Sequence, residues 1–104
     1  MTLAQSSTAS ELSARFLRLV ESEPAVRRLW FRVDRDDLEL WLLTSPAEPA
    51  TERFLYEASG RLQAETPAVP LVLHVLNPRF YEDGTDLVAL VPPGAEELSP
   101  RRPR

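Results

Sequence analysis

The sequence predicts an α+β protein, a two-layer α/β sandwich with the element order α-β-β-α-β, a three-stranded mixed sheet and a C-terminal extended segment. Two stretches carry apolar residues at the spacing of an amphipathic helix, and two runs between them alternate strictly between apolar and polar residues. A nearly continuous apolar run after the second helical stretch predicts a third strand. With 104 residues the chain can build one core. The domain is expected over residues 11–94, with flexible tails at 1–10 and 95–104.

The first helix is expected from Glu11 to Ser22. Its apolar stripe consists of Leu12, Phe16, Leu19 and Val20. Pro24 follows closely, and a proline disfavours helical conformation in the residue before it. The helix is therefore expected to end just before this proline.

A β-hairpin is the clearest local pattern in the chain. Residues 28–34 and 37–44 are expected to be its strands, with Arg35 and Asp36 as the turn. This register places Leu29 opposite Leu42, Phe31 opposite Leu40 and Val33 opposite Leu38, all on one face. It also places Trp30 opposite Trp41 and Arg32 opposite Glu39 on the other face. A shift by one residue would destroy both matches, so the register is well specified.

Ser45 and Pro46 indicate a second helix, with a later start at Pro49 as the alternative. Its apolar stripe consists of Phe54, Leu55, Ala58 and Leu62. A third strand is expected from Leu71 to Leu76, and a right-handed crossover would make it parallel to the second strand. Residues 86–91 are expected to form either a short fourth strand or an extended segment against the core.

The second face of the sheet is the predicted interaction surface. The two helices cover the first face, which leaves the second without a helical layer. Its expected residues are Trp30, Arg32, Glu39, Trp41, Leu43 and His74. Aromatic residues and arginine are enriched in interface cores, so a second copy or another protein partner is expected here. The alternative is that residues 79–94 fold over this face with Phe80, Tyr81, Leu87 and Leu90.

No residue pattern predicts catalysis or metal binding. His74 is the only histidine, and no nucleophile-elbow glycines accompany a serine. The acidic residues near the hairpin turn are Asp34, Asp36, Asp37 and Glu39. They lack the glycine and the alternating ligands of a calcium loop, so they are interpreted as a charged hairpin tip. No catalytic, cofactor-binding or metal-binding residue is therefore expected.

The run Asp37-Leu38-Glu39-Leu40 resembles the acid–apolar–acid–apolar strand of the nucleotidyltransferase superfamily, which includes small antitoxin proteins. That family also has the core order helix, strand, strand, helix, strand. The Gly-Ser motif that precedes its carboxylates is absent here, and His74 stands on the strand where a further carboxylate is expected. The resemblance therefore implies a degenerate, antitoxin-type relative that retains Asp37 and Glu39.

Residues 12–78 resemble a second family, the cytoplasmic dimerisation domain of cation diffusion facilitator transporters. The similarity is carried by PAVRRLWFRVDRDDLELWLLT, a following helix, and LVLHVLNP. It implies the same order of elements and pairing of two copies. Metal ligands are not implied, because the first strand holds no histidine.

Together these observations predict a non-enzymatic interaction module, most simply a homodimer formed through the Trp30/Trp41 face. The alternative is the degenerate nucleotidyltransferase-like protein. No cofactor, nucleic acid or membrane partner is expected. Residues 1–10 lack the basic and apolar regions of a signal peptide, and the longest uncharged apolar stretch, residues 66–78, is interrupted by prolines. A soluble cytoplasmic protein is therefore expected.

Overall fold

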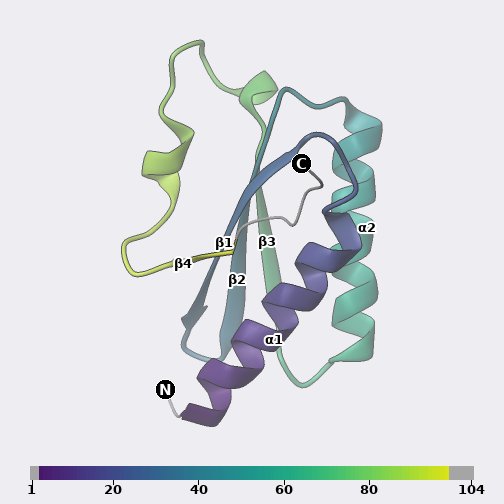
Figure 1. The fold of residues 1–104 in the computed structure, drawn as a ribbon, viewed down its shortest axis with the longest axis vertical. Helices are drawn as coiled ribbons and strands as arrows, with labels where there is room; N and C mark the ends of the chain where they lie inside the picture. The colour runs from purple at the N-terminus through teal and green to yellow at the C-terminus, as the bar shows by residue number, and fades with distance from the viewer. Residues whose placement is uncertain (1–2, 99–104) are drawn as a thin grey trace.

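The computed structural model of this chain describes residues 3–98, with side chains from Thr8 onward (Figure 1). Its helices are α1 (Leu3–Val20) and α2 (Pro49–Glu65). Its strands are β1 (Val26–Asp34), β2 (Asp37–Thr44), β3 (Leu71–Leu76) and β4 (Glu96–Leu98). Two short 3-10 helices, η1 (Pro78–Phe80) and η2 (Leu87–Leu90), lie between β3 and β4. The fold is α+β, as the sequence predicts.

The sheet has four strands in the order β3-β2-β1-β4, rather than the expected three. β1 is antiparallel to both β2 and β4, and β3 is parallel to β2, as the crossover argument predicts. Residues 86–91, expected as a strand or an extended segment, contain η2 instead. The additional strand is β4, a three-residue segment that pairs with the outer edge of β1. β4 is too short to show an alternating pattern, so only the available edge of β1 defines it.

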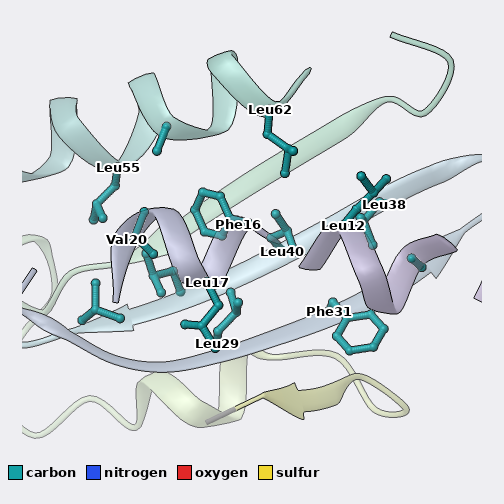
Figure 2. Packing of buried hydrophobic residues seen from close by; sticks show 14 residues of the cluster. Leu12, Phe16, Leu17, Val20, Leu29, Phe31, Leu38, Leu40, Leu55 and Leu62 are labelled. Carbon is teal, nitrogen blue, oxygen red and sulfur yellow. The ribbon is translucent and has the colours of Figure 1, made fainter. Parts of the chain in front are cut away.

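Both helices lie on one face of the sheet, and residues 79–95 lie on the other (Figure 1). The main core fills the space between helices and sheet. In Figure 2, Phe16 of α1, Leu62 of α2 and Leu40 of β2 lie close together in this core. All three side chains are at most 1% exposed. The two apolar stripes and the hairpin predict this layer, except that Leu19, expected in the stripe of the first helix, is exposed and Leu17 is buried instead.

Helix α1 begins at Leu3, inside the segment expected as a flexible tail, and ends at Val20 rather than Ser22. Ala9 is 2% exposed and belongs to the main core, so the apolar stripe extends a turn further toward the N-terminus than its large residues indicate. The small side chain of Ala9 packs where the sequence shows no strong hydrophobic signal. Similarly, residues 96–98 of the expected C-terminal tail form β4.

The hairpin register is confirmed at every predicted pair, including Trp30 with Trp41 and Arg32 with Glu39. Arg35 closes the turn with a φ of 58°, the left-handed conformation that such a turn requires. A register shift between Val26 and Arg28 marks an additional residue in β1. Because of this bulge, Val26 joins the main core.

Helix α2 begins at Pro49, the later of the two expected starts. Leu55, Ala58 and Leu62 are buried as predicted, whereas Phe54 is 40% exposed and lies outside the core. Within residues 3–98, no helix is long and apolar enough to cross a membrane.

Candidate interaction surface

Half of the second sheet face is covered by the chain itself. Trp30 and Trp41 are each 6% exposed and form a second hydrophobic cluster with Leu76 and Leu87. Leu43, Val91 and Ala95 pack around this cluster. The segment 79–94 therefore folds over this face, as the alternative expectation states, but of its four named residues only Leu87 is buried. Phe80, Tyr81 and Leu90 are exposed. Both tryptophans are interior residues. The irregular segment after β3 covers them, as a helix would in a sheet with helices on both faces.

The segment that provides this cover is irregular. It leaves the sheet after η1, returns through η2 and enters β4 (Figure 1). Gly84 and Gly94 have φ values of 84° and 85°, a left-handed conformation that glycine adopts without steric cost. Leu87 is the one buried residue of η2, and it anchors the segment on the tryptophans. At the end of the segment, Arg28 donates two hydrogen bonds, of 2.7 and 2.8 Å, to the carboxylate of Glu97 in β4.

The other half of the face is polar and open to solvent. Arg32 donates a 2.8 Å hydrogen bond to Oε1 of Glu39, and Nε2 of His74 lies 3.5 Å from Oε2 of the same carboxylate. The His74 side chain is 41% exposed, that of Arg32 34% and that of Glu39 only 16%. We call these three residues the polar cluster. Sheet register places all three side by side, because Arg32 faces Glu39 and His74 is one diagonal step away on β3.

Trp41 contacts both the covered and the open half of this face. The ring of His74 stacks on it with a centroid distance of 4.8 Å and an interplanar angle of 14°. The guanidinium of Arg32 lies 5.6 Å from the centroid of the same indole. Hydrogen bonding to Glu39 raises the pKa of Arg32 further above its ordinary value. In this ion pair the positive charge of Arg32 balances the negative charge of Glu39.

The polar cluster lacks the partners that catalysis by histidine needs. The sheet positions around His74 are Glu39, Trp41, Leu43, Val72 and Leu76. None carries a hydroxyl or a thiol, so no nucleophile stands beside the imidazole. Among the described residues, no group of three metal-ligating side chains could hold an ion.

The nucleotidyltransferase-like reading requires carboxylates on this same face. Asp37 and Glu39 do share the face, two positions apart on β2. Both oxygens of Glu39 already face Arg32 and His74. The residues of β3 whose side chains lie on the second face are Val72, His74 and Leu76, so this strand adds no carboxylate there. Within residues 3–98, no set of acidic groups is brought together for two-metal chemistry.

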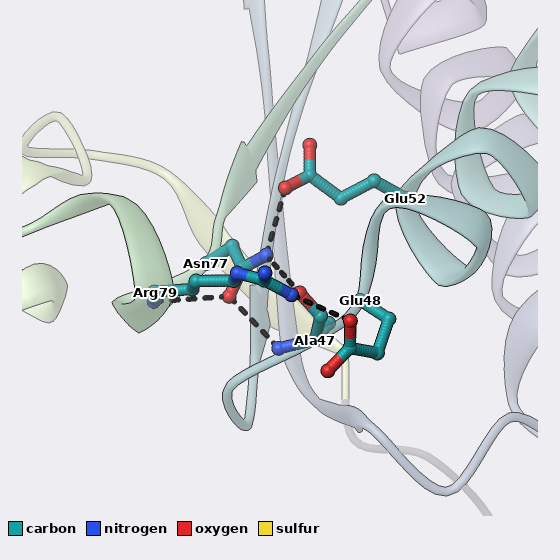
Figure 3. Close-up of polar contacts among 5 residues, drawn as sticks. All are labelled: Ala47, Glu48, Glu52, Asn77 and Arg79. Atoms are coloured by element: carbon teal, nitrogen blue, oxygen red, sulfur yellow. Dashed lines mark hydrogen bonds and ion pairs between the residues drawn. The ribbon is translucent and has the colours of Figure 1, made fainter.

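The carboxyl ends of β2 and β3 form the edge where open α/β sheets usually bind ligands. Here Asn77, 1% exposed, fills that position with its own side chain (Figure 3). Its amide nitrogen donates to the carbonyl of Ala47 at 2.9 Å and to Glu52 at 2.7 Å. Its amide oxygen accepts from the N–H of Ala47 at 3.0 Å and of Arg79 at 3.1 Å. The crevice is thus closed by a structural clamp that joins the β2–α2 loop to the end of β3.

A groove of about 480 Å³ lies at the opposite end of the sheet. Its walls come from the start of α1, the hairpin turn and the α2–β3 loop. Its lining residues include Ala9, Val33, Leu38 and Val69, with Asp36 and Asp37. The lining is largely apolar, and Arg35 lies with the two carboxylates at the hairpin side. Among the described residues, this lining has no feature that specifies a ligand.

The outer edge of β3 is the remaining unpaired structural element. Leu38 donates its N–H to the carbonyl of Pro70, which sets the alternation of the parallel ladder. The backbone groups of Val72, His74 and Leu76 therefore face β2, and those of the odd-numbered residues Leu71, Leu73 and Val75 face outward. Sheet order places no strand beside them in the described part of the chain.

One of these outward groups has a side-chain partner. The N–H of Leu71 donates a 2.7 Å hydrogen bond to Oε1 of Gln63 on α2. Gln63 contacts the start of β3, and Glu52 contacts Asn77 directly after its end. Tyr56 is four residues from Glu52 and seven from Gln63, a spacing that places all three on the same side of α2. Tyr56 is 47% exposed. The side of the molecule around β3 thus combines unpaired backbone groups with an exposed aromatic residue and Val72, which is 37% exposed.

The sequence places all three residues of the polar cluster on the predicted interaction surface, whereas the β3 edge has no signal of its own in the sequence. The position of β3 at the edge of the sheet follows from strand order, which the sequence specifies only through the crossover rule. Comparison with protein-family models, with curated proteins and with solved structures found no match for this chain.

Proposed function

We propose that this protein is a non-enzymatic interaction module that self-associates through the side of the molecule formed by β3. The observation that supports the proposal is the outer edge of β3, an uncharged apolar strand whose outward backbone groups at Leu73 and Val75 have no partner among residues 3–98. An exposed edge of this kind is a template for pairing with another strand. The polar cluster and Val72 lie directly beside it on the second face.

Two further features favour binding over catalysis. His74 stacks on an indole and faces a carboxylate that Arg32 already neutralises, which leaves it without a nucleophile to activate. Asn77 occupies the crevice in which a substrate of an α/β fold would bind. Trp41 contributes to this surface indirectly, because the ring of His74 stacks on its indole and the guanidinium of Arg32 lies over the same ring.

Sedimentation velocity over micromolar to millimolar concentrations tests the proposal. The wild-type sedimentation coefficient is expected to rise with concentration, and Val72→Lys is expected to weaken association at least about tenfold, because it places a hydrated charge in the contact. Val88→Lys is the matched control: Val88 is also 37% exposed, but it belongs to η2 rather than to the sheet. A wild type that stays monomeric throughout would refute self-association.

A titration with Mg²⁺ and nucleotide, followed by heteronuclear NMR, tests the enzyme-like alternative. We expect the amide signals of Asp37 and Glu39 to remain in place. Saturable shifts confined to these residues would favour the degenerate nucleotidyltransferase reading instead.

A further inference from the structure

We propose that two copies pair antiparallel through β3 about a two-fold axis at His74, which joins their two four-stranded sheets into one continuous sheet. The inference rests on the proposed self-association and adds its partner and register. A two-fold axis makes the contact self-complementary, so each unpaired group meets the matching group of the second copy.

The hydrogen-bonding capacity of the edge selects the register. If the axis passed through Leu73, the N–H of Leu71 would have to donate to Val75 of the second copy. That N–H already donates to Gln63. If the axis passes through His74, Leu73 pairs with Val75 of the second copy, and each donates its N–H to the other's carbonyl. This register uses only groups that have no partner among residues 3–98.

The side chains are compatible with this pairing. β3 carries no formal charge in its neutral-histidine form, so no like charges oppose one another. His74 faces its symmetry mate at a non-hydrogen-bonded position, where opposite side chains come closest. Each imidazole still has Glu39 beside it, and each Glu39 is held by Arg32. On the helical side, Tyr56 of each copy lies beside the strand that its partner adds.

The two edges of the sheet differ in how they are protected, which also points to a second copy. The other edge strand, β4, has only three residues and carries Glu96 and Glu97. The β3 edge has no charged residue, no proline and no bulge within Leu71–Leu76, the usual devices that prevent strand pairing. Proline occurs only just outside the strand, at Pro70 and Pro78. Every copy of the chain presents the same unprotected edge, so self-pairing needs no further partner.

Disulfide trapping tests the register directly, because the chain has no cysteine and each variant therefore carries one thiol. In His74→Cys the two thiols face each other across the axis, at the Cα separation of about 4.4–6.8 Å that a disulfide requires. In the control, Val72→Cys, the two thiols are offset by four residues along the strands, about 13 Å at 3.3 Å per residue. Under mild oxidation, His74→Cys is expected to form covalent dimer at least about tenfold faster.

Amide exchange on the wild-type protein provides a second measurement that needs no substitution. Raising the concentration should slow exchange at Leu73 and Val75, while Val72 and His74, which already face β2, should change little. Equal or faster trapping of Val72→Cys, or a wild-type dimer without added protection at Leu73 and Val75, would overturn this pairing but leave self-association in place. A wild type that never dimerises would remove both.

Discussion

Asn77 is expected to be the most sensitive polar position in the protein. Its side chain makes four hydrogen bonds, to both backbone groups of Ala47, to Glu52 and to the N–H of Arg79. Asn77→Ala would remove all four and leave a void where the crevice is now closed. The β2–α2 loop would then lose its attachment to the end of β3.

The cost can be worked from burial. Ala47 is 4% exposed, so its N–H and carbonyl would remain buried without partners, at about 1–3 kcal/mol each. Glu52 is only half-buried and Arg79 is exposed, so water can replace the other two bonds at little cost. The expected loss in the free energy of unfolding is about 3 kcal/mol, a large fraction of the roughly 5–15 kcal/mol of a small domain.

Urea unfolding followed by circular dichroism measures this loss. With a slope near 1.5 kcal/mol/M, the midpoint should fall by about 2 M. The control is Arg79→Ala, which removes only the exposed ion pair with Glu48 and should cost about 0–1 kcal/mol. Asn77→Asp should be at least as destabilising as Asn77→Ala, because it places a second carboxylate next to Glu52. An Asn77→Ala variant within about 1 kcal/mol of wild type would refute the argument.

Three further perturbations test the surface. Leu87→Ser should release residues 79–95 from the sheet, so the emission of the two buried tryptophans shifts to the red while the far-ultraviolet dichroism of the helices persists; unchanged emission would count against the covering role of this segment. The hydrogen bonds from Arg28 hold the pKa of Glu97 below its ordinary value, so their stabilising effect is present above the ordinary pKa of about 4.3 and is lost as pH falls through the lowered pKa. Glu97→Gln should therefore flatten the acid limb of the stability profile slightly, and a profile identical to wild type would contradict this. Tyr56→Lys should weaken self-association measured by sedimentation, whereas Phe54→Lys, on the other side of α2 and similarly exposed, should not; equal effects would argue against the β3 side.

Much of the architecture could be predicted because local patterns carry it. The register of Trp30 with Trp41 follows from strict alternation on both strands, and the structure confirms it. The position of β3 follows from the handedness of a strand–helix–strand crossover. Pro49 sets the start of α2, because proline is well suited to the first turn of a helix.

Other features depended on contacts between distant residues. The segment after β3 has no periodicity, and Leu87 became its anchor only because the tryptophans left apolar surface without a helix to cover it. β4 formed because β1 had an unpaired edge within reach. These elements belong to the part of the chain where sequence patterns predicted least.

The sequence by itself determined which residues face which side of the hairpin and in what order the helices and strands occur. These properties depend on spacings of a few residues. Only the tertiary structure decided that the tryptophans lie inside, that Asn77 closes the crevice and that the β3 edge stays unpaired among the described residues. Asn77 binds Ala47 across 30 positions of sequence, and Gln63 selects the unpaired groups of β3 by reaching Leu71 from another element. Polar side chains of this kind acquire their roles from the backbone groups that folding brings to them, and those groups leave no pattern in the neighbouring sequence.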